Sequence, residues 1–123
     1  MIGEINSLAL AYIGDAVYEL CVREYLISKG LCKVKELQQE SIKYVSAKGQ
    51  YQILSKMIDE RFFNDEELNM IFRARNHKIE HRPKSCDIAT YKYATGFEAI
   101  IGYLYLNKNY NRINEIMDYI RGE

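Results

Sequence analysis

The sequence predicts an all-α fold in a single domain. A chain of 123 residues with 48% hydrophobic residues can bury one core, and it is too short for two ordinary domains. It contains one proline and seven glycines, which leaves few places where a helix has to stop. Apolar residues recur at helical spacing, whereas no alternating apolar and polar run is long enough to favour a sheet. We therefore expect roughly five to seven helices.

The first half of the chain contains two predicted helical regions. The first runs from about Asn6 to Ser28 and is followed by Gly30, a residue suited to a left-handed cap. A short piece, "KVKELQQ", then leads into a predicted helix over "ESIKYVSAKGQYQILSKMI". In that stretch a row at helical spacing forms one face, made up of Ile42, Val45, Gly49, Ile53 and Met57.

Three further helices are predicted in the second half. "NDEELNMIFRAR" begins with Asn64 as a cap and acidic residues in its first turn, and its last turn is basic, so both ends suit the helix dipole. Residues 77–87 form the long connection, because Pro83 removes a backbone donor and disfavours helix before it. A helix follows over about residues 88–107, with Asp87 as its cap, and "YNRINEIMDYIRG" closes the chain.

The composition also indicates where the protein works. No apolar run is long enough to span a bilayer, and the start "MIGEINS" lacks a basic segment followed by an apolar stretch. We therefore expect neither membrane insertion nor export. Three cysteines without short spacing, Cys21, Cys32 and Cys86, argue against a disulfide framework. They fit a reducing compartment, so we expect a cytoplasmic protein.

The formal net charge is +0, but the charges are unevenly distributed. Residues 1–70 hold 8 Lys or Arg against 11 Asp or Glu, whereas residues 71–123 hold 9 against 6. Much of the basic excess lies in "RARNHKIEHRPK", residues 73–84. Such a patch can contact phosphates and give salt-dependent binding of nucleic acid. A solvated loop is the structural alternative.

Two isolated carboxylates raise a question of chemistry. Asp15 lies in the middle of "LALAYIGDAVYEL", and Glu98 is the only charge in "YATGFEAIIGYLYL". An ionised group on a would-be core face is costly unless it is paired or bound to a metal. Small residues lie in the same two segments, at Ala11, Gly14, Ala94, Gly96 and Gly102. They would let two helices approach closely and bring both acids around one hard cation.

Structural explanations of these acids stay open at this point. Asp15 could cap a helix that begins beside it, and Glu98 could pair with Arg23 or Arg73. Glu19 lies one turn from Asp15 and is a tempting third ligand, although a solvent-facing or salt-bridged acid is the simpler interpretation. Spacing alone does not decide between these interpretations.

Two other groups of residues invite functional interpretations. His77, His81 and Cys86 have the spacing H-x3-H-x4-C, but zinc sites usually need four protein ligands or three well-placed ones. A basic loop is the favoured interpretation of this segment. Tyrosines in apolar segments are expected to pack in the core or at a dimer interface rather than to stack on bases. These tyrosines are Tyr12, Tyr18, Tyr93, Tyr103 and Tyr105.

Two segments resemble the motifs of one enzyme family. "LAYIGDAVYEL" resembles the ribonuclease III signature, whose usual form is LEFLGDAVLEL, and "TGFEAIIGYLYL" resembles that family's second acidic motif, DTLEALIGAIYLD. The motifs occur in the family's order, with a helical chain between them. The short branch called Mini-ribonuclease III is the nearest resemblance, because of "RARN" followed by "K" at 78 and of "YLYL" at 103–106. The resemblance covers essentially the whole chain.

This resemblance implies a ribonuclease III-type catalytic domain over residues 1–123, without the double-stranded-RNA-binding domain of full members. It implies that Asp15 and Glu98 are the metal-binding catalytic acids. Ala11 and Thr95 stand where the family usually has a glutamate and an aspartate, so two of the four usual acids are absent, as in the Mini branch. The implied cofactor is Mg²⁺, with Mn²⁺ as a substitute; it would activate water and neutralise charge at the phosphate.

The resemblance also implies a homodimer that cleaves double-stranded RNA. The implied substrate is the stem of a large-subunit ribosomal RNA precursor, with a ribosomal protein as a possible helper. The catalytic domain itself is expected to grip the duplex, mainly through the basic segment. The expected contacts are Arg73, Arg75, Asn76, His77, Lys78, Arg82, Lys84 and Lys48. A non-catalytic duplex-RNA-binding dimer is the alternative, and a structural helical adaptor is a third hypothesis.

Overall fold

The computed structural model describes residues 4–78, 84 and 86–122. This part of the chain forms six helices and no strands, which confirms the predicted all-α fold. The helices are α1 (Ser7–Ser28), α2 (Val34–Val45), α3 (Ala47–Asp59), α4 (Asp65–Arg75), α5 (Ile88–Leu106) and α6 (Tyr110–Arg121). None of these six helices is long and apolar enough to cross a membrane.

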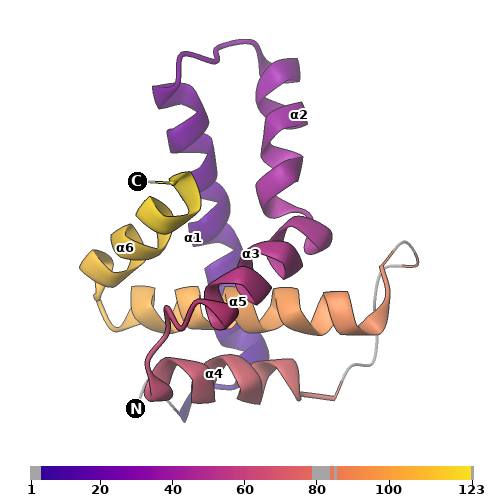
Figure 1. The fold of residues 1–123 in the computed structure, drawn as a ribbon, viewed down its shortest axis with the longest axis vertical. Helices are drawn as coiled ribbons and strands as arrows, with labels where there is room; N and C mark the ends of the chain where they lie inside the picture. Colours follow the sequence, from indigo (N-terminus) through magenta and orange to yellow (C-terminus); the bar gives the residue numbers. More distant parts are fainter. Residues whose placement is uncertain (1–3, 79–83, 85, 123) are drawn as a thin grey trace.

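Helix α5 is the centre of the fold. It packs against α1, α3, α4 and α6, and Figure 1 shows it crossing the molecule with α1 behind it, α3 in front and α4 alongside. Its side chains are apolar nearly all round, which is the pattern of a buried helix. Phe97, Ile100 and Ile101 are fully buried. Around them the core is completed from the other helices by residues such as Tyr18, Leu54, Ile71 and Ile116.

Two glycines determine how closely α1 and α5 approach each other. A Cβ atom at Gly14 would lie 1.7 Å from the backbone oxygen of Glu98, and a Cβ atom at Gly102 would lie 1.9 Å from that of Leu10. Both distances are far shorter than a van der Waals contact, so only glycine fits at these positions. The prediction that small residues let the two acid-bearing helices approach closely is confirmed for Gly14 and Gly102, whereas Gly96 lies against Ile71 of α4.

The predicted helix ends are confirmed where the sequence contains a local cap. The side chains of Asn6, Asn64 and Asp87 accept backbone N–H groups in the first turns of α1, α4 and α5. Asn64 and Glu67 form a reciprocal capping box. Gly30 follows α1 with a φ of 94°, the left-handed conformation expected of it. The first or last residues of these helices are therefore determined by neighbours in the sequence.

The prediction of one helix over residues 40–58 is wrong. The chain turns at Ser46, whose φ and ψ are −65° and 156°, so α2 ends there and α3 begins. The Ser46 hydroxyl oxygen accepts the N–H of Gly49 at 3.0 Å, and this cap outweighs the apolar repeat. The predicted apolar face is divided between two helices, and Ile42 is 58% exposed.

Replacing Gly14 by alanine is expected to lower the free energy of unfolding by about 3 kcal/mol or more, because the new methyl group has to push α1 away from α5. Urea unfolding measures this change. Gly30→Ala is the matched control, because nothing lies within 4 Å of its Cβ position. Its left-handed backbone alone should cost about 1 kcal/mol. Equal losses in the two variants would contradict the close crossing.

Candidate active site

Asp15 and Glu98 lie at the crossing of α1 and α5. Asp15 directly follows Gly14, and the backbone oxygen of Glu98 is the nearest atom to the Gly14 Cβ position. The negative charge of Asp15 contributes to the raised pKa of Glu98, so the two carboxyl groups lie close to one another at this crossing. The fold therefore unites the two acids that the sequence separates.

The two acids have different surroundings. Glu98 is half-buried, whereas Asp15 is exposed, so the expectation that Asp15 lies on a core face is wrong. Burial, and next the negative charge of Asp15, raise the pKa of Glu98 to about 8. A hydrogen bond of 3.3 Å from Gln50 Nε2 to Glu98 Oε2 opposes that rise. Only this one hydrogen bond offsets the effect of burial and of the neighbouring negative charge, so a bound cation would stabilise the pair of carboxylates.

The structural alternatives for the two acids are wrong. α1 begins at Ser7, so Asp15 lies in the middle of this helix and caps no helix end. Arg23 pairs with Glu19 at 3.4 Å, which confirms the simpler interpretation of Glu19 as a salt-bridged acid. Within the residues that the structure describes, no lysine or arginine forms an ion pair with Glu98.

Short side chains occupy the positions of the two missing acids. Ala11 and Thr95 are each 7% exposed. The Thr95 hydroxyl donates to the Tyr91 carbonyl of its own helix at 3.0 Å. The described part of the chain contains no cluster of three or more His, Cys, Asp or Glu side chains placed to hold a metal. A cation held here would take two protein carboxylates and complete its shell with water.

Gln50 belongs to this site, although the sequence pattern does not single it out. It is 2% exposed, and its Nε2 donates both to the Val45 carbonyl at 3.0 Å and to Glu98. Its partner Glu98 is 48 positions away in the chain. The one feature of the sequence that points to Gln50 is its position next to Gly49, a residue of the predicted apolar face.

The predicted RNA-contacting residues lie at the end of α4, in the connection after it and on α3. Arg75 is half-buried, with its guanidinium 4.4 Å from the ring centre of Phe72 and 5.8 Å from that of Tyr93. His77 is half-buried as well, and Arg82 lies outside the described residues. Exposed side chains are found at Arg73, Asn76, Lys78, Lys84 and Lys48. Apart from Arg75, then, most of this set faces solvent.

The other groups singled out in the sequence have mixed outcomes. The zinc hypothesis depends on His81, which lies outside the described residues. Tyr18 is fully buried and donates to the Tyr44 carbonyl at 2.9 Å, so its assignment to the core is confirmed. Tyr12 is 84% exposed and is not a core residue of this chain. Half-buried or partly exposed rings are found at Tyr93, Tyr103 and Tyr105.

Comparison with known proteins agrees with this geometry. The Ribonuclease III domain family matches residues 8–109, a range that includes both acids. Proteins named Mini-ribonuclease 3 from Streptococcus pneumoniae and Brevibacillus brevis are 40% and 46% identical over 94% and 91% of this chain, and the matches cover 90% and 82% of their own lengths. The crystal structure of protein FN1578 from Fusobacterium nucleatum has a TM-score of 0.85 and 34% identity, covering 98% of this chain and 95% of that one.

The chain therefore belongs to the ribonuclease III family, a family of endoribonucleases. Within that family, its similarity to proteins named Mini-ribonuclease 3 extends over nearly the whole chain and confirms the branch that "RARN" with Lys78 and "YLYL" indicated.

The Glu98→Gln variant is expected to lose less stability than the wild type as the pH rises from about 5 to about 8 without divalent cations. A carboxyl with a raised pKa binds its proton more tightly in the native state, so the wild type is destabilised as the pH climbs toward the Glu98 pKa of about 8. The two proteins should diverge by on the order of 2 kcal/mol.

Urea unfolding at each pH, with EDTA present, measures this divergence. Glu36→Gln is the matched control, because this glutamate is exposed on α2. Its pH profile should run parallel to that of the wild type. Parallel profiles for Glu98→Gln and the wild type would show that Glu98 has no raised pKa.

Proposed function

We propose that this chain is a divalent-metal-dependent endoribonuclease that cleaves double-stranded RNA, with Asp15 and Glu98 as its catalytic acids. The observation that carries the proposal is the meeting of these two carboxylates at the glycine crossing of α1 and α5. Family membership supports the reaction class.

The residues present fit a hard divalent cation. Both donors are carboxylates, which Mg²⁺ prefers, and Mn²⁺ is a suitable substitute. Burial, and next the charge of Asp15, raise the pKa of Glu98, and no lysine or arginine of the described residues forms an ion pair with it. When bound, such an ion lowers the pKa of a coordinated water and neutralises charge on the phosphodiester. Asp15 and Glu98 would hold and orient it, and Glu98 would release its proton on binding.

The basic residues at the end of α4 support an RNA substrate. Arg73 and Lys78 are exposed there, and the aromatic contacts of Arg75 hold its guanidinium in a defined place. Contacts of this kind read the phosphate positions of an A-form duplex rather than its base sequence. The natural substrate we propose is the stem of a large-subunit ribosomal RNA precursor, bound in the cytoplasm with a ribosomal protein as helper.

We propose further that the enzyme is a homodimer that pairs through the outer face of α1. Leu8, Tyr12 and Leu20 lie four and then eight residues apart on this helix and are 42%, 84% and 59% exposed. Ala16 completes the row, which continues into an apolar groove lined in part by Tyr105. An apolar stripe of this length on one helix is typical of a surface that a partner covers.

Asp15→Asn and Glu98→Gln are each expected to slow cleavage of a defined RNA duplex at least about 100-fold in Mg²⁺, because each removes one charge from the cation site. Duplex binding in a gel shift should stay close to that of the wild type. Asp59→Asn and Glu36→Gln, which change exposed acids away from the crossing, should cleave normally. Wild-type protein that binds duplex RNA but never cuts it, in Mg²⁺ or Mn²⁺, would favour the non-catalytic alternative.

Leu20→Arg is expected to convert the dimer to monomers in sedimentation velocity at micromolar concentration, because it buries a charge in the proposed interface. Ile42→Arg on α2 is the matched control, since Ile42 and Leu20 are 58% and 59% exposed. The control should remain dimeric. A wild type that is monomeric, or equal behaviour of both variants, would contradict this interface.

A further inference from the structure

Gln50 has the most deeply buried polar side chain in the described part of the chain, and the proposed roles of Asp15 and Glu98 do not account for its burial. It lies in the second turn of α3, and α5 passes between this helix and α1 (Figure 1). Glu98 on α5 therefore meets Asp15 from one helix and Gln50 from another. Gln50 is in position to act on the geometry of Glu98.

The neighbours of Gln50 fix the orientation of its amide. Val45 offers a carbonyl oxygen at 3.0 Å and Glu98 a carboxylate oxygen at 3.3 Å, and both groups accept hydrogen bonds. The NH₂ group has to face them, because the amide oxygen would be repelled by both. Each of its two hydrogens then has one acceptor, and Gln50 bonds to only one of the two carboxylate oxygens of Glu98, Oε2.

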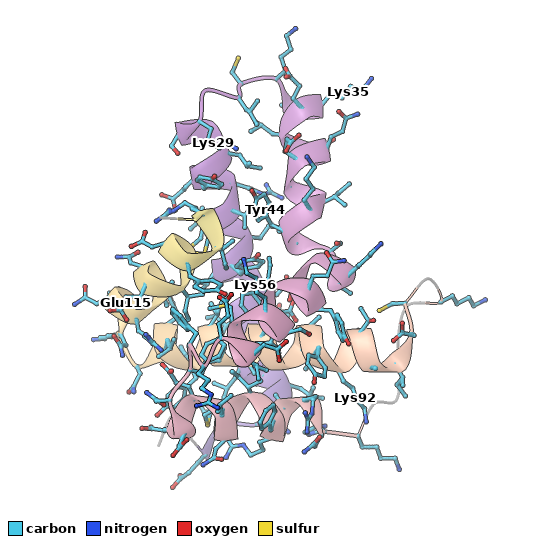
Figure 2. All side chains as sticks on the ribbon, in the orientation of Figure 1. Lys29, Lys35, Tyr44, Lys56, Lys92 and Glu115 are labelled. Atoms are coloured by element: carbon cyan, nitrogen blue, oxygen red, sulfur yellow. The ribbon has the colours of Figure 1, made fainter. Side chains whose placement is uncertain are left out.

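The corner between α2 and α3 holds Gln50 in place independently of Glu98. Helix C-termini leave carbonyls without intrahelical partners. Here the Tyr18 hydroxyl donates a hydrogen bond to the carbonyl of Tyr44, and the Gln50 amide donates one to the carbonyl of Val45. The side chain of Tyr44 lies between α2 and α1 (Figure 2). A Cβ at Gly49 would lie 2.3 Å from a backbone oxygen of α2, so the corner is also tightly closed.

Packing alone does not account for this glutamine. Its Oε1 atom is buried and has no hydrogen-bond partner within the described residues. Burying an unpaired polar atom costs about 1–3 kcal/mol, a cost that an apolar side chain of equal volume would avoid. The NH₂ group offsets this cost through its hydrogen bonds to the Val45 carbonyl and to Glu98, and only the second of these acts on the site.

We propose that Gln50 is a positioning residue for the metal site: it tethers one oxygen of Glu98 so that the other is aimed at the cation shared with Asp15. This inference rests on the proposed function. Hydrogen bonds of this kind orient a carboxylate ligand and favour its charged form, and their loss typically weakens metal binding 10–100-fold. In this proposal Gln50 acts through Glu98 and is not itself a ligand of the ion.

Gln50→Met is the direct test, because methionine has a similar volume and no donor. Mn²⁺ binding, followed by the electron paramagnetic resonance of the free ion, should weaken about 10–100-fold. The Mg²⁺ concentration needed for half-maximal cleavage should rise in parallel, with no change in the KM for duplex RNA. Gln52→Met, an exposed position on the same helix, should bind Mn²⁺ like the wild type.

Circular dichroism and metal-free urea unfolding establish that each variant is folded. If Gln50→Met does not fold, Gln50→Asn takes its place, since it keeps an amide but is too short to bridge Val45 and Glu98 together. In unaltered protein, the Gln50 side-chain NH₂ signals in a ¹⁵N NMR spectrum should move as Mg²⁺ is added and stop when the site is saturated.

Unchanged Mn²⁺ affinity in a folded Gln50 variant, or NH₂ signals that ignore Mg²⁺ while the wild type binds and cleaves normally, would overturn the role of Gln50 alone. A wild type that neither binds Mn²⁺ nor shows metal-dependent cleavage would instead overturn the proposed function. The two failures are therefore distinguishable.

Discussion

The backbones of α1 and α5 touch at Gly14 and Gly102, where even a methyl group cannot be accommodated. This contact makes α5 the central helix, since the side chains on its other faces are then free to pack against α3 and α4. It also sets the distance between Asp15 and Glu98, which lie directly beside it. The same close packing of α1 and α5 thus forms the centre of the core and places the two acids together. The unfavourable pairing of two acids is tolerated because the burial of α5 offsets it.

Three helices around this crossing each contribute one side chain to the site. α1 supplies an exposed acid, α5 a half-buried one, and α3 a buried amide that bonds to the second acid. Burial disfavours the charged form of the Glu98 carboxyl group, whereas the hydrogen bond from Gln50 favours that form. We propose that this balance favours cation binding, because the two carboxylates repel each other and a bound cation would stabilise them. The exposed apolar residues of α1, which form the proposed dimer interface, lie on the same helix as Asp15, the proposed catalytic acid.

Much of this could be predicted where the cause is local. Asn64 and Asp87 mark helix starts because their caps act within three residues, and the small residues around Asp15 and Glu98 indicated that their helices meet. The break at Ser46 was hidden by an apolar repeat that continues across it. Gln50 could not be found from spacing, because its partner comes from another helix. The exposure of Asp15 depends on which face of α1 the other helices cover, and this is a property of the whole fold.

Anomalous diffraction from crystals soaked in Mn²⁺ would show whether Asp15 and Glu98 share one divalent cation. We expect a single strong peak between the two carboxylates, with an oxygen of each at about 2.1 Å or one water molecule away. A peak elsewhere, or none at saturating Mn²⁺ with both side chains ordered, would contradict it.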